Sequence, residues 1–222
     1  MTAQGQLDPE RLVTLAATLV GTDANVSLTV LPARGGPRTL AATSPLSLAV
    51  DALQYSLGEG PCLEAIKADD LTLTGDLGHD DRWPQFGPRC AEDLGVHSML
   101  GVRLMLDGPE RGALNFCALA HDTFTDADAE VAATLSPFVS LVLQNVLQER
   151  RLVDLETALS SSRSIGTAVG ILMASKLVTA EDAFSLLSRT SQELNRKLRD
   201  VAAQVALTGE LPPIPTRERA AE

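Results

Sequence analysis

Short apolar runs dominate the first part of the chain and predict β-strands. Four of them are rich in β-branched and aliphatic residues and are bounded by Gly and Pro, at 26–31, Leu71–Thr74, Ser98–Leu106 and Gly112–Leu119. Asp107-Gly108-Pro109 separates the last two and predicts a hairpin turn. Segments with helical spacing flank these runs, at Pro9–Val20, Pro45–Tyr55, Gly60–Ala68, Gln85–Leu94 and Asp126–Gln148. The pattern predicts an α+β fold with helices around a mainly antiparallel sheet.

After Thr125 the pattern is helical almost throughout. Thr125 followed by Asp126 and Asp128 predicts a capped helix start. Positions 141, 145, 148, 152, 155 and 159 then alternate in steps of four and three, which is the spacing of a coiled-coil seam with two polar positions. An amphipathic helix packed on its own domain would show the same spacing. We favour the seam, because 148–151 (QERR) lies at an expected domain boundary, and its predicted dimer or linker contacts are Leu141, Leu152, Leu155 and Leu159.

Two further helices are predicted near the C-terminus. Thr179, with an acidic residue three positions later, is expected to cap one helix, and Asn195 is expected to cap another over Arg196–Leu207. Gly209 and Pro212-Pro213 end the pattern. We therefore expect an α+β domain over 1–148, a helical domain over 149–208 and a disordered tail over 209–222.

Charge divides the chain at the same place. The 222 residues carry a net charge of −11, but residues 1–149 hold 8 basic and 20 acidic residues while residues 150–222 hold 10 and 9. This asymmetry suggests two modules with different partners. Three cysteines are too few for a disulfide scaffold, and neither a signal peptide nor a long uninterrupted apolar stretch is visible. The expectation is a cytoplasmic protein without membrane contact.

Residues 161–205 resemble the ANTAR domain, a three-helix RNA-binding module of bacterial transcription antiterminators. The resemblance rests on three motifs in order: Ile165-Gly166-x-Ala168-x-Gly170-Ile171-Leu172-Met173, Thr179-x-Glu181-Asp182-Ala183-Phe184-x-Leu186-Leu187, and Ser191-Gln192-x-x-Asn195-x-Lys197-Leu198-Arg199-Asp200-Val201-Ala202. Many members carry Lys where this chain has Val169.

Residues from about 10 to 148 resemble a GAF domain of the type joined to ANTAR in actinobacterial proteins. The matching pieces are Leu57-Gly58-Glu59-Gly60-Pro61-Cys62-x-x-Ala65, Asp81-Arg82-Trp83-Pro84, Gly95-Val96-His97-Ser98 and Gly112-Ala113-Leu114-Asn115. The resemblance implies a small-molecule or redox sensing fold, often dimeric, without naming a ligand or a cofactor.

The combined resemblance implies a homodimeric regulator whose C-terminal domain binds paired stem-loops in a nascent leader RNA and prevents a terminator from forming. RNA affinity rests on cations near phosphates and on polar groups that reach bases. The expected RNA contacts are Arg163, Gly166, Gly170, Lys176, Ser191, Gln192, Asn195, Arg196, Lys197 and Arg199. Phe184 is expected in the core. The alternative is a ligand-sensing dimer whose C-terminal helices bind a protein.

The candidate ligand-binding residues of the first domain are Cys62, Trp83, His97 and Asn115. Cys62 lies near a predicted helix N-terminus, where the helix dipole lowers a thiol pKa; a structural role is the competing interpretation. Trp83 and His97 also have structural interpretations, as a loop anchor and as a partly buried imidazole. Cysteine spacing does not support a zinc site, and no hydrolase, P-loop or dinucleotide motif is present. An enzyme is not expected.

Overall fold

The computed structural model describes residues 8–20, 24–68 and 71–213. The chain divides into two compact units, Met1–Gln148 and Glu149–Glu222, which we call the α/β unit and the helical unit. One long helix, α5 (Asp126–Lys176), contributes residues to both. The fold is α+β, as the sequence predicts.

The α/β unit is built on one antiparallel sheet with the strand order β2-β1-β5-β4-β3. Its strands are β1 (Asn25–Leu31), β2 (Arg38–Ala42), β3 (Leu71–Thr74), β4 (Ser98–Leu104) and β5 (Arg111–Ala118). The four predicted strands are confirmed to within a few residues, and β4 and β5 form the expected hairpin. β2 was not predicted, because it is short and lies at the sheet edge, where it pairs only with β1.

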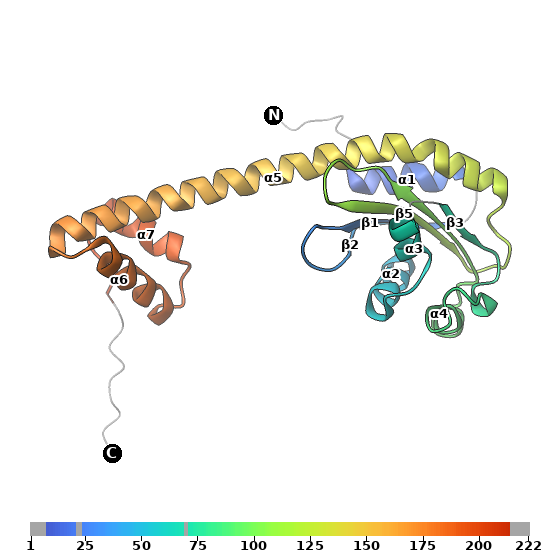
Figure 1. Cartoon of the computed structure of the whole chain (residues 1–222), viewed down its shortest axis with the longest axis horizontal. Helices are drawn as coiled ribbons and strands as arrows, with labels where there is room; N and C mark the ends of the chain where they lie inside the picture. Colours follow the sequence, from blue (N-terminus) through green and yellow to red (C-terminus); the bar gives the residue numbers. More distant parts are fainter. Residues whose placement is uncertain (1–7, 21–23, 69–70, 214–222) are drawn as a thin grey trace, which may run out of the picture. The chain divides into compact units, whose positions relative to one another are not determined.

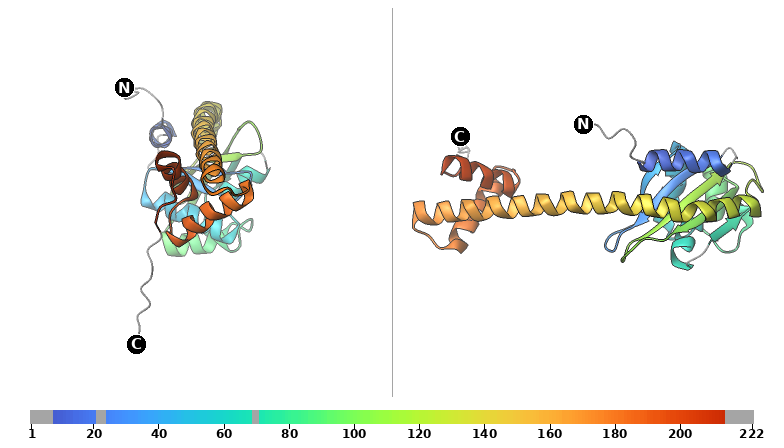
Figure 2. Two further views of the ribbon diagram at one scale, coloured as in Figure 1. Left: turned by 90° about the vertical axis from the view of Figure 1, so that its left-hand side faces the viewer. Right: turned by 90° about the horizontal axis from the view of Figure 1, so that it is seen from above.

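Helices cover both faces of this sheet (Figure 1). α1 (Pro9–Val20) and the first part of α5 lie side by side on one face, as the view from above also shows (Figure 2). The other face carries α2 (Pro45–Leu57), α3 (Pro61–Ala68), the 3-10 turn η1 (Leu77–His79) and α4 (Phe86–Leu94). Ser44 caps α2 by accepting the N–H of Ser47, and Gly58, with φ 70°, ends it in the left-handed conformation.

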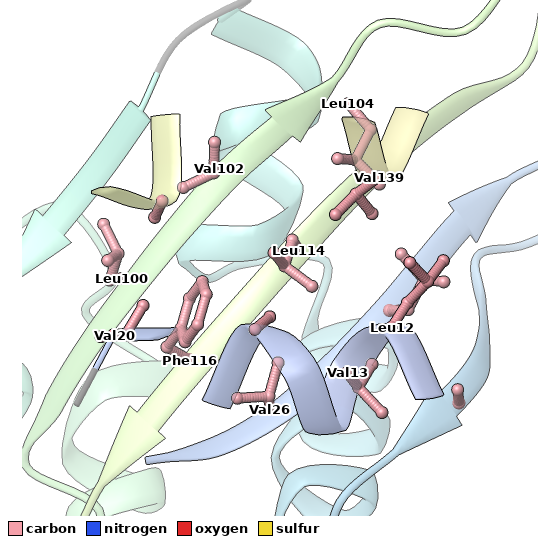
Figure 3. Packing of buried hydrophobic residues seen from close by; sticks show 14 of the residues in the cluster. Leu12, Val13, Val20, Val26, Leu100, Val102, Leu104, Leu114, Phe116 and Val139 are labelled. Atoms are coloured by element: carbon pink, nitrogen blue, oxygen red, sulfur yellow. The ribbon is translucent and has the colours of Figure 1, made fainter. Parts of the chain in front are cut away.

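Alternation along the strands sends successive side chains to opposite faces. On β5, Leu114 and Phe116 enter the core beneath α1 and α5, whereas Asn115 and Cys117 point to the α2–α4 side. Val26 and Leu28 of β1 join the first core together with Leu12 and Val13 of α1 and Val139 of α5 (Figure 3). α1 and α5 are therefore fixed to the sheet by one continuous apolar cluster.

The N-terminal end of α5 is closed by the predicted cap. The N–H and the hydroxyl of Thr125 both donate to a carboxylate oxygen of Asp128, at 2.8 and 2.7 Å. Among the described residues, α5 alone is long and apolar enough for a membrane span by length and composition. Its apolar residues Ala132, Val139, Leu143 and Leu147 belong to the core of the α/β unit, which accounts for part of that apolar character.

The helical unit consists of the last part of α5 with α6 (Ala180–Glu193) and α7 (Leu198–Thr208). Its buried core is formed by Ala168, Leu172, Ala183, Leu187, Val201, Ala202 and Val205. Thr179 caps α6 as predicted, by accepting the N–H of Asp182. Leu211 packs against this core and Pro212 is buried, so a disordered tail does not begin at residue 209. The rest of the predicted tail, 214–222, lies outside the described residues.

The predicted start of the third helix is wrong. α7 begins at Leu198, with Lys197 at the N-cap position, and Asn195 lies in the preceding turn with φ 50°. Asparagine tolerates this left-handed conformation better than most residues. The sequence signal at Asn195 therefore belongs to a turn between two helices and not to a cap.

Candidate functional sites

Six of the ten predicted RNA contacts lie in the turn between α6 and α7 or in the helical residues beside it. Ser191 ties the turn together, because its hydroxyl donates to the carbonyl of Arg196 at 2.6 Å and its own carbonyl accepts the Arg196 N–H at 3.0 Å. Asn195 reverses the chain between them. The turn thus holds Arg196 and Lys197 directly before α7, where free backbone N–H groups and the helix dipole favour anions.

The cations of this turn are exposed. The guanidinium of Arg196 donates to the side-chain oxygen of Gln204 on α7 at 2.8 Å. Arg199 contacts Asp200, with 3.6 Å between Nε and Oδ1. An exposed pair of this kind contributes little and leaves the guanidinium accessible. Asn195, Lys197 and Gln192 are also exposed, while Ser191 is half-buried.

The remaining predicted contacts lie elsewhere on the helical unit. Arg163, Gly166 and Gly170, which we call the glycine patch, fall within about 60° of one another around α5 and are all exposed. Ala168 and Leu172, on the opposite side of the helix, enter the core with α6 and α7. Lys176 lies about 140° around the helix from Arg163. The structure therefore separates the glycine patch from the α6–α7 turn.

The two glycines of this patch are not sites of close helix packing. A Cβ atom added to Gly166 or Gly170 would meet no other atom within 4 Å. Phe184 is also not in the core, since 46% of its surface is exposed. Its position in an apolar sequence pattern was misleading, because the neighbouring Ala183 and Leu187 make the core contact of α6.

The α/β unit contains a buried polar cluster between the sheet and α2. The carboxylate of Asp51 accepts a hydrogen bond from the hydroxyl of Thr39 at 2.7 Å and from the amide of Asn115 at 3.4 Å. The Tyr55 hydroxyl hydrogen bonds with the hydroxyls of Thr29 and Thr39, at 2.8 and 3.0 Å. The cluster thus joins α2 to three neighbouring strands.

Two side-chain atoms of this region have no hydrogen-bond partner among the described residues. They are Nε2 of Gln54 and Oδ1 of Asn115. The other amide atom of Gln54, Oε1, accepts the N–H of Cys62 at 2.9 Å. Because buried amides are normally satisfied, these two atoms are exceptions in an otherwise hydrogen-bonded region.

Burial controls the ionisation of the cluster. It raises the pKa of Asp51, although hydrogen bonds from Thr39 and its neighbours oppose the rise. The pKa of Tyr55 is raised by the same cause. Burial also raises the pKa of the Cys62 thiol to about 12, with the Asp51 charge adding to the effect. The helix dipole therefore does not lower the Cys62 pKa, because desolvation dominates, and the structural interpretation of this thiol is favoured.

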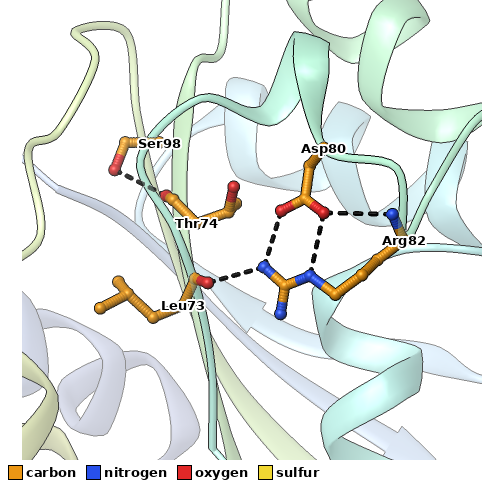
Figure 4. Close-up of polar contacts among 5 residues, drawn as sticks. All are labelled: Leu73, Thr74, Asp80, Arg82 and Ser98. Atoms are coloured by element: carbon orange, nitrogen blue, oxygen red, sulfur yellow. Dashed lines mark hydrogen bonds and ion pairs between the residues drawn. The ribbon is translucent and has the colours of Figure 1, made fainter.

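Trp83 is a buried anchor beside a surface pocket. Its ring is 2% exposed and packs in the core near α4, and the Arg82 guanidinium lies over it at 4.3 Å. Arg82 also donates to both carboxylate oxygens of Asp80 and to the carbonyl of Leu73 (Figure 4), which holds the pKa of Asp80 below its usual value. The pocket, of about 210 Å³, is lined by Gly58, Glu59, Gly60, Leu63, Glu64, Lys67, Arg82 and Trp83.

His97 occupies a different part of the unit. Its imidazole stacks on that of His121, with 4.1 Å between the ring centroids, and its Nδ1 has no partner among the described residues. Of the four predicted ligand-binding residues, only Cys62 and Asn115 lie by the polar cluster. Within residues 8–20, 24–68 and 71–213, no group of three or more His, Cys, Asp and Glu side chains is placed to hold a metal ion.

Most of the polar cluster is not predicted by the sequence. No site prediction covers Thr29, Thr39, Asp51, Gln54 and Tyr55, although an acidic residue in the otherwise apolar segment 48–53 is a usable signal. The predicted dimer or linker residues, by contrast, are exposed in the single chain: Leu141 by 62%, Leu152 by 62%, Leu155 by 66% and Leu159 by 57%.

Comparison with protein families identifies both units. A family model described as GAF domain matches residues 7–144, and one described as ANTAR domain matches residues 153–205. A comparison with curated proteins finds no match.

Solved structures with the fold of the α/β unit include a domain of a putative two-component sensor histidine kinase from Sinorhizobium meliloti, with a TM-score of 0.50 and 14% identity. That match covers 64% of this chain and 92% of the other. The GAF domain of a phosphoenolpyruvate-protein phosphotransferase from Coxiella burnetii matches with a TM-score of 0.48 and 16% identity. This match covers 64% of this chain and 84% of the other. A type II free methionine-R-sulfoxide reductase from Thermoplasma acidophilum matches with a TM-score of 0.47 and 17% identity. This match covers 60% of this chain and 86% of the other. At these identities the first match shows the fold alone.

Proposed function

The chain belongs to the GAF domain family and carries an ANTAR domain after it, and we propose on this basis that it is an RNA-binding transcription antitermination regulator. In this proposal the helical unit of a cytoplasmic homodimer binds paired stem-loops in a nascent leader transcript. Holding them prevents a terminator hairpin from forming. The α/β unit acts as a sensor, and no enzymatic activity is part of the proposal.

The observation that carries the proposal is the ordered cationic turn before α7. Arg196, Lys197 and Arg199 are exposed within four residues, and the Ser191 hydroxyl fixes the backbone that bears them. Cations held close to a helix N-terminus suit RNA phosphates, while the exposed amides of Gln192 and Asn195 suit base edges. Exposed Phe184 adds a ring on which an unpaired base can stack.

The sensor part of the proposal rests on the buried polar cluster. A small polar molecule that reached Gln54 Nε2 or Asn115 Oδ1 would satisfy a buried group that has no partner among the described residues. Such a molecule regulates the chain only if it binds two states with different affinity. Since α2 and the sheet both contribute to the cluster, the relevant states differ in how α2 sits on β1 and β5.

The test is a salt titration of binding to a two-stem-loop leader RNA. We expect the affinity of the wild-type chain to fall steeply with salt. In the variant Arg196→Ala/Lys197→Ala/Arg199→Ala, the slope should lessen by about one for each cation that pairs with an RNA phosphate. The matched control is Arg34→Ala/Arg38→Ala/Arg89→Ala, which removes three exposed cations from the α/β unit. The control should keep the wild-type slope.

The alternative function is a ligand-sensing dimer whose C-terminal helices bind a protein. The exposed Leu177 and Leu207, at 92% and 88%, are the observation in its favour. It predicts that the affinity for the protein partner depends only weakly on salt and is lost when the exposed apolar residues are substituted. Equal RNA affinity for the triple variant and its control would reject the RNA proposal and leave this one.

A further inference from the structure

The surface pocket of about 210 Å³, which we call the α3 pocket, lies on the side of α3 that faces away from the sheet. Cys62 and Ile66 direct α3 toward the sheet, where they form an apolar cluster with Ala113 of β5. At about 100° per residue, Glu64 lies on the opposite side of the helix, and it lines the α3 pocket together with Lys67. The α3 pocket is therefore separate from the buried polar cluster.

The charged groups that line the α3 pocket balance one another. They are two acidic residues, Glu59 and Glu64, and two basic residues, Lys67 and Arg82. Two of the four are already used by the fold. The carboxylate of Glu59 accepts two backbone N–H groups at the start of α4, at 2.9 and 3.1 Å. The guanidinium of Arg82 is paired with the carboxylate of Asp80 through Nε and Nη2.

The side chains of Glu64 and Lys67 remain available to a ligand. They stand three positions apart on α3, yet neither makes a hydrogen bond or an ion pair with a residue that the structure describes. Nη1 of Arg82 also makes no hydrogen bond within the described part of the chain. One carboxylate, one ammonium and one guanidinium nitrogen thus border a space of about seven water molecules, at roughly 30 Å³ each.

We propose that the α3 pocket binds a small zwitterion of the free α-amino acid type, with its carboxylate on Lys67 and Arg82 and its ammonium on Glu64. A lining without net charge is complementary to a ligand without net charge. A simple anion would leave Glu64 unpaired, and a simple cation would leave Lys67 unpaired. Leu63 supplies a short apolar wall, so the pocket suits an amino acid with a short side chain.

Gly60 connects the α3 pocket to the buried polar cluster. It lines the pocket with φ 125°, and any side chain at this position would clash with Gln54. Oε1 of Gln54 in turn accepts the N–H of Cys62. A ligand seated against Gly60 would therefore hold the turn between α2 and α3 in the conformation that supports Gln54. The proposal gives a ligand class to the sensor, and its regulatory part rests on the proposed function.

The first test measures binding to the full chain by isothermal titration calorimetry, without RNA. The probes are glycine, alanine, serine, threonine and valine as free amino acids. We expect at least one of them to bind with a dissociation constant below about 1 mM. Its N-acetyl and amide derivatives are the controls, because each lacks one of the two charges and should bind about ten-fold more weakly or worse. No binding by any probe, or equal binding by a derivative, would overturn the proposal.

The second test locates the site with charge-neutralising variants. Glu64→Gln and Lys67→Gln should each weaken binding about ten-fold or more, because each removes one ion pair with the ligand. Glu92→Gln and Arg38→Gln are the matched controls, since they neutralise one exposed acid and one exposed base of the α/β unit outside the α3 pocket. If a variant and its control bind the ligand equally well, the ligand lies elsewhere and the proposal is wrong. A failure of RNA binding leaves both tests unaffected.

Discussion

The hydroxyl of Ser140 on α5 accepts a hydrogen bond from the backbone N–H of Met105, just beyond the end of β4, at 2.9 Å. It is the middle one of three regularly spaced contacts, which we call the ladder. In the other two, the hydroxyl of Ser136 donates to the carbonyl of Arg103 at 2.5 Å and the side chain of Gln144 hydrogen bonds with Asp107. The helix residues of the ladder are four apart and their partners are two apart. Four residues of a helix rise about 6 Å and two residues of a strand about 6.6 Å, so each contact falls opposite its partner. The ladder couples the β4–β5 hairpin directly to α5.

We predict that Ser140→Ala destabilises the α/β unit by about 1–2 kcal/mol, because the partly buried N–H of Met105 loses its acceptor. Urea denaturation followed by circular dichroism measures the change. Thr14→Ala on α1 is the control. The hydroxyls of Ser140 and Thr14 both donate to the carbonyl four residues earlier in their own helix, but only the Ser140 hydroxyl also hydrogen bonds with another element. Equal stability for the two variants would show that the ladder contributes nothing.

Asp51 should make the α/β unit less stable as the pH rises. Its pKa in the folded chain is raised above the ordinary value of an aspartate, so the folded state binds its proton more tightly than the unfolded state. This contribution is complete below the unfolded pKa and is lost as the pH rises through the folded pKa.

Asp51→Asn removes the titration and retains the shape of the side chain. We expect the free energy of unfolding of the variant, relative to wild type, to grow as the pH rises from about 4 until the native Asp51 is fully ionised. Guanidinium titrations at several pH values measure the difference. A difference that stays constant with pH would show that Asp51 does not titrate differently on folding.

The sequence predicted the elements well where one periodicity ran without interruption. The strands with apolar runs and the helices α1 to α4 follow directly from alternation and helical spacing. β2 is not predicted, because its five residues, RTLAA, show too few alternations between polar and apolar positions to be distinguished from a loop. The start of α7 was misplaced because asparagine is favoured both at caps and in left-handed turns, and only the Ser191–Arg196 bonds decide between them.

The candidate sites were less predictable for a different reason. Thr29, Asp51 and Asn115 meet in space but are separated by up to 86 residues, and no local pattern links them. The RNA-binding residues were named from a resemblance that gives positions along the chain but not faces of a helix. That resemblance therefore did not reveal that Arg163 lies away from the α6–α7 turn.

The three thiols should resist modification in the folded chain. Cys62, Cys90 and Cys117 are all buried, and burial raises the pKa of Cys62 and of Cys90 to about 12. Because the thiolate is the reactive form, Ellman's reagent should label none of them within minutes at about pH 8 and all three in guanidinium. Rapid labelling of Cys62 in the native chain, located by mass spectrometry, would instead indicate an accessible, reactive thiol.

Gly166→Ala separates the roles of a glycine in helix stability and in binding. A Cβ atom at this position meets nothing within 4 Å, so alanine should fit without strain. Alanine should also stabilise the helical unit, by about 0.5–1 kcal/mol, because it loses less backbone entropy than glycine. If RNA approaches the backbone closely at Gly166, the same variant should bind the leader RNA more weakly while unfolding at a higher temperature. Since the variant is more stable, weaker binding cannot be attributed to unfolding. Unchanged affinity would remove the glycine patch of Arg163, Gly166 and Gly170 from the RNA interface and leave that interface to the α6–α7 turn.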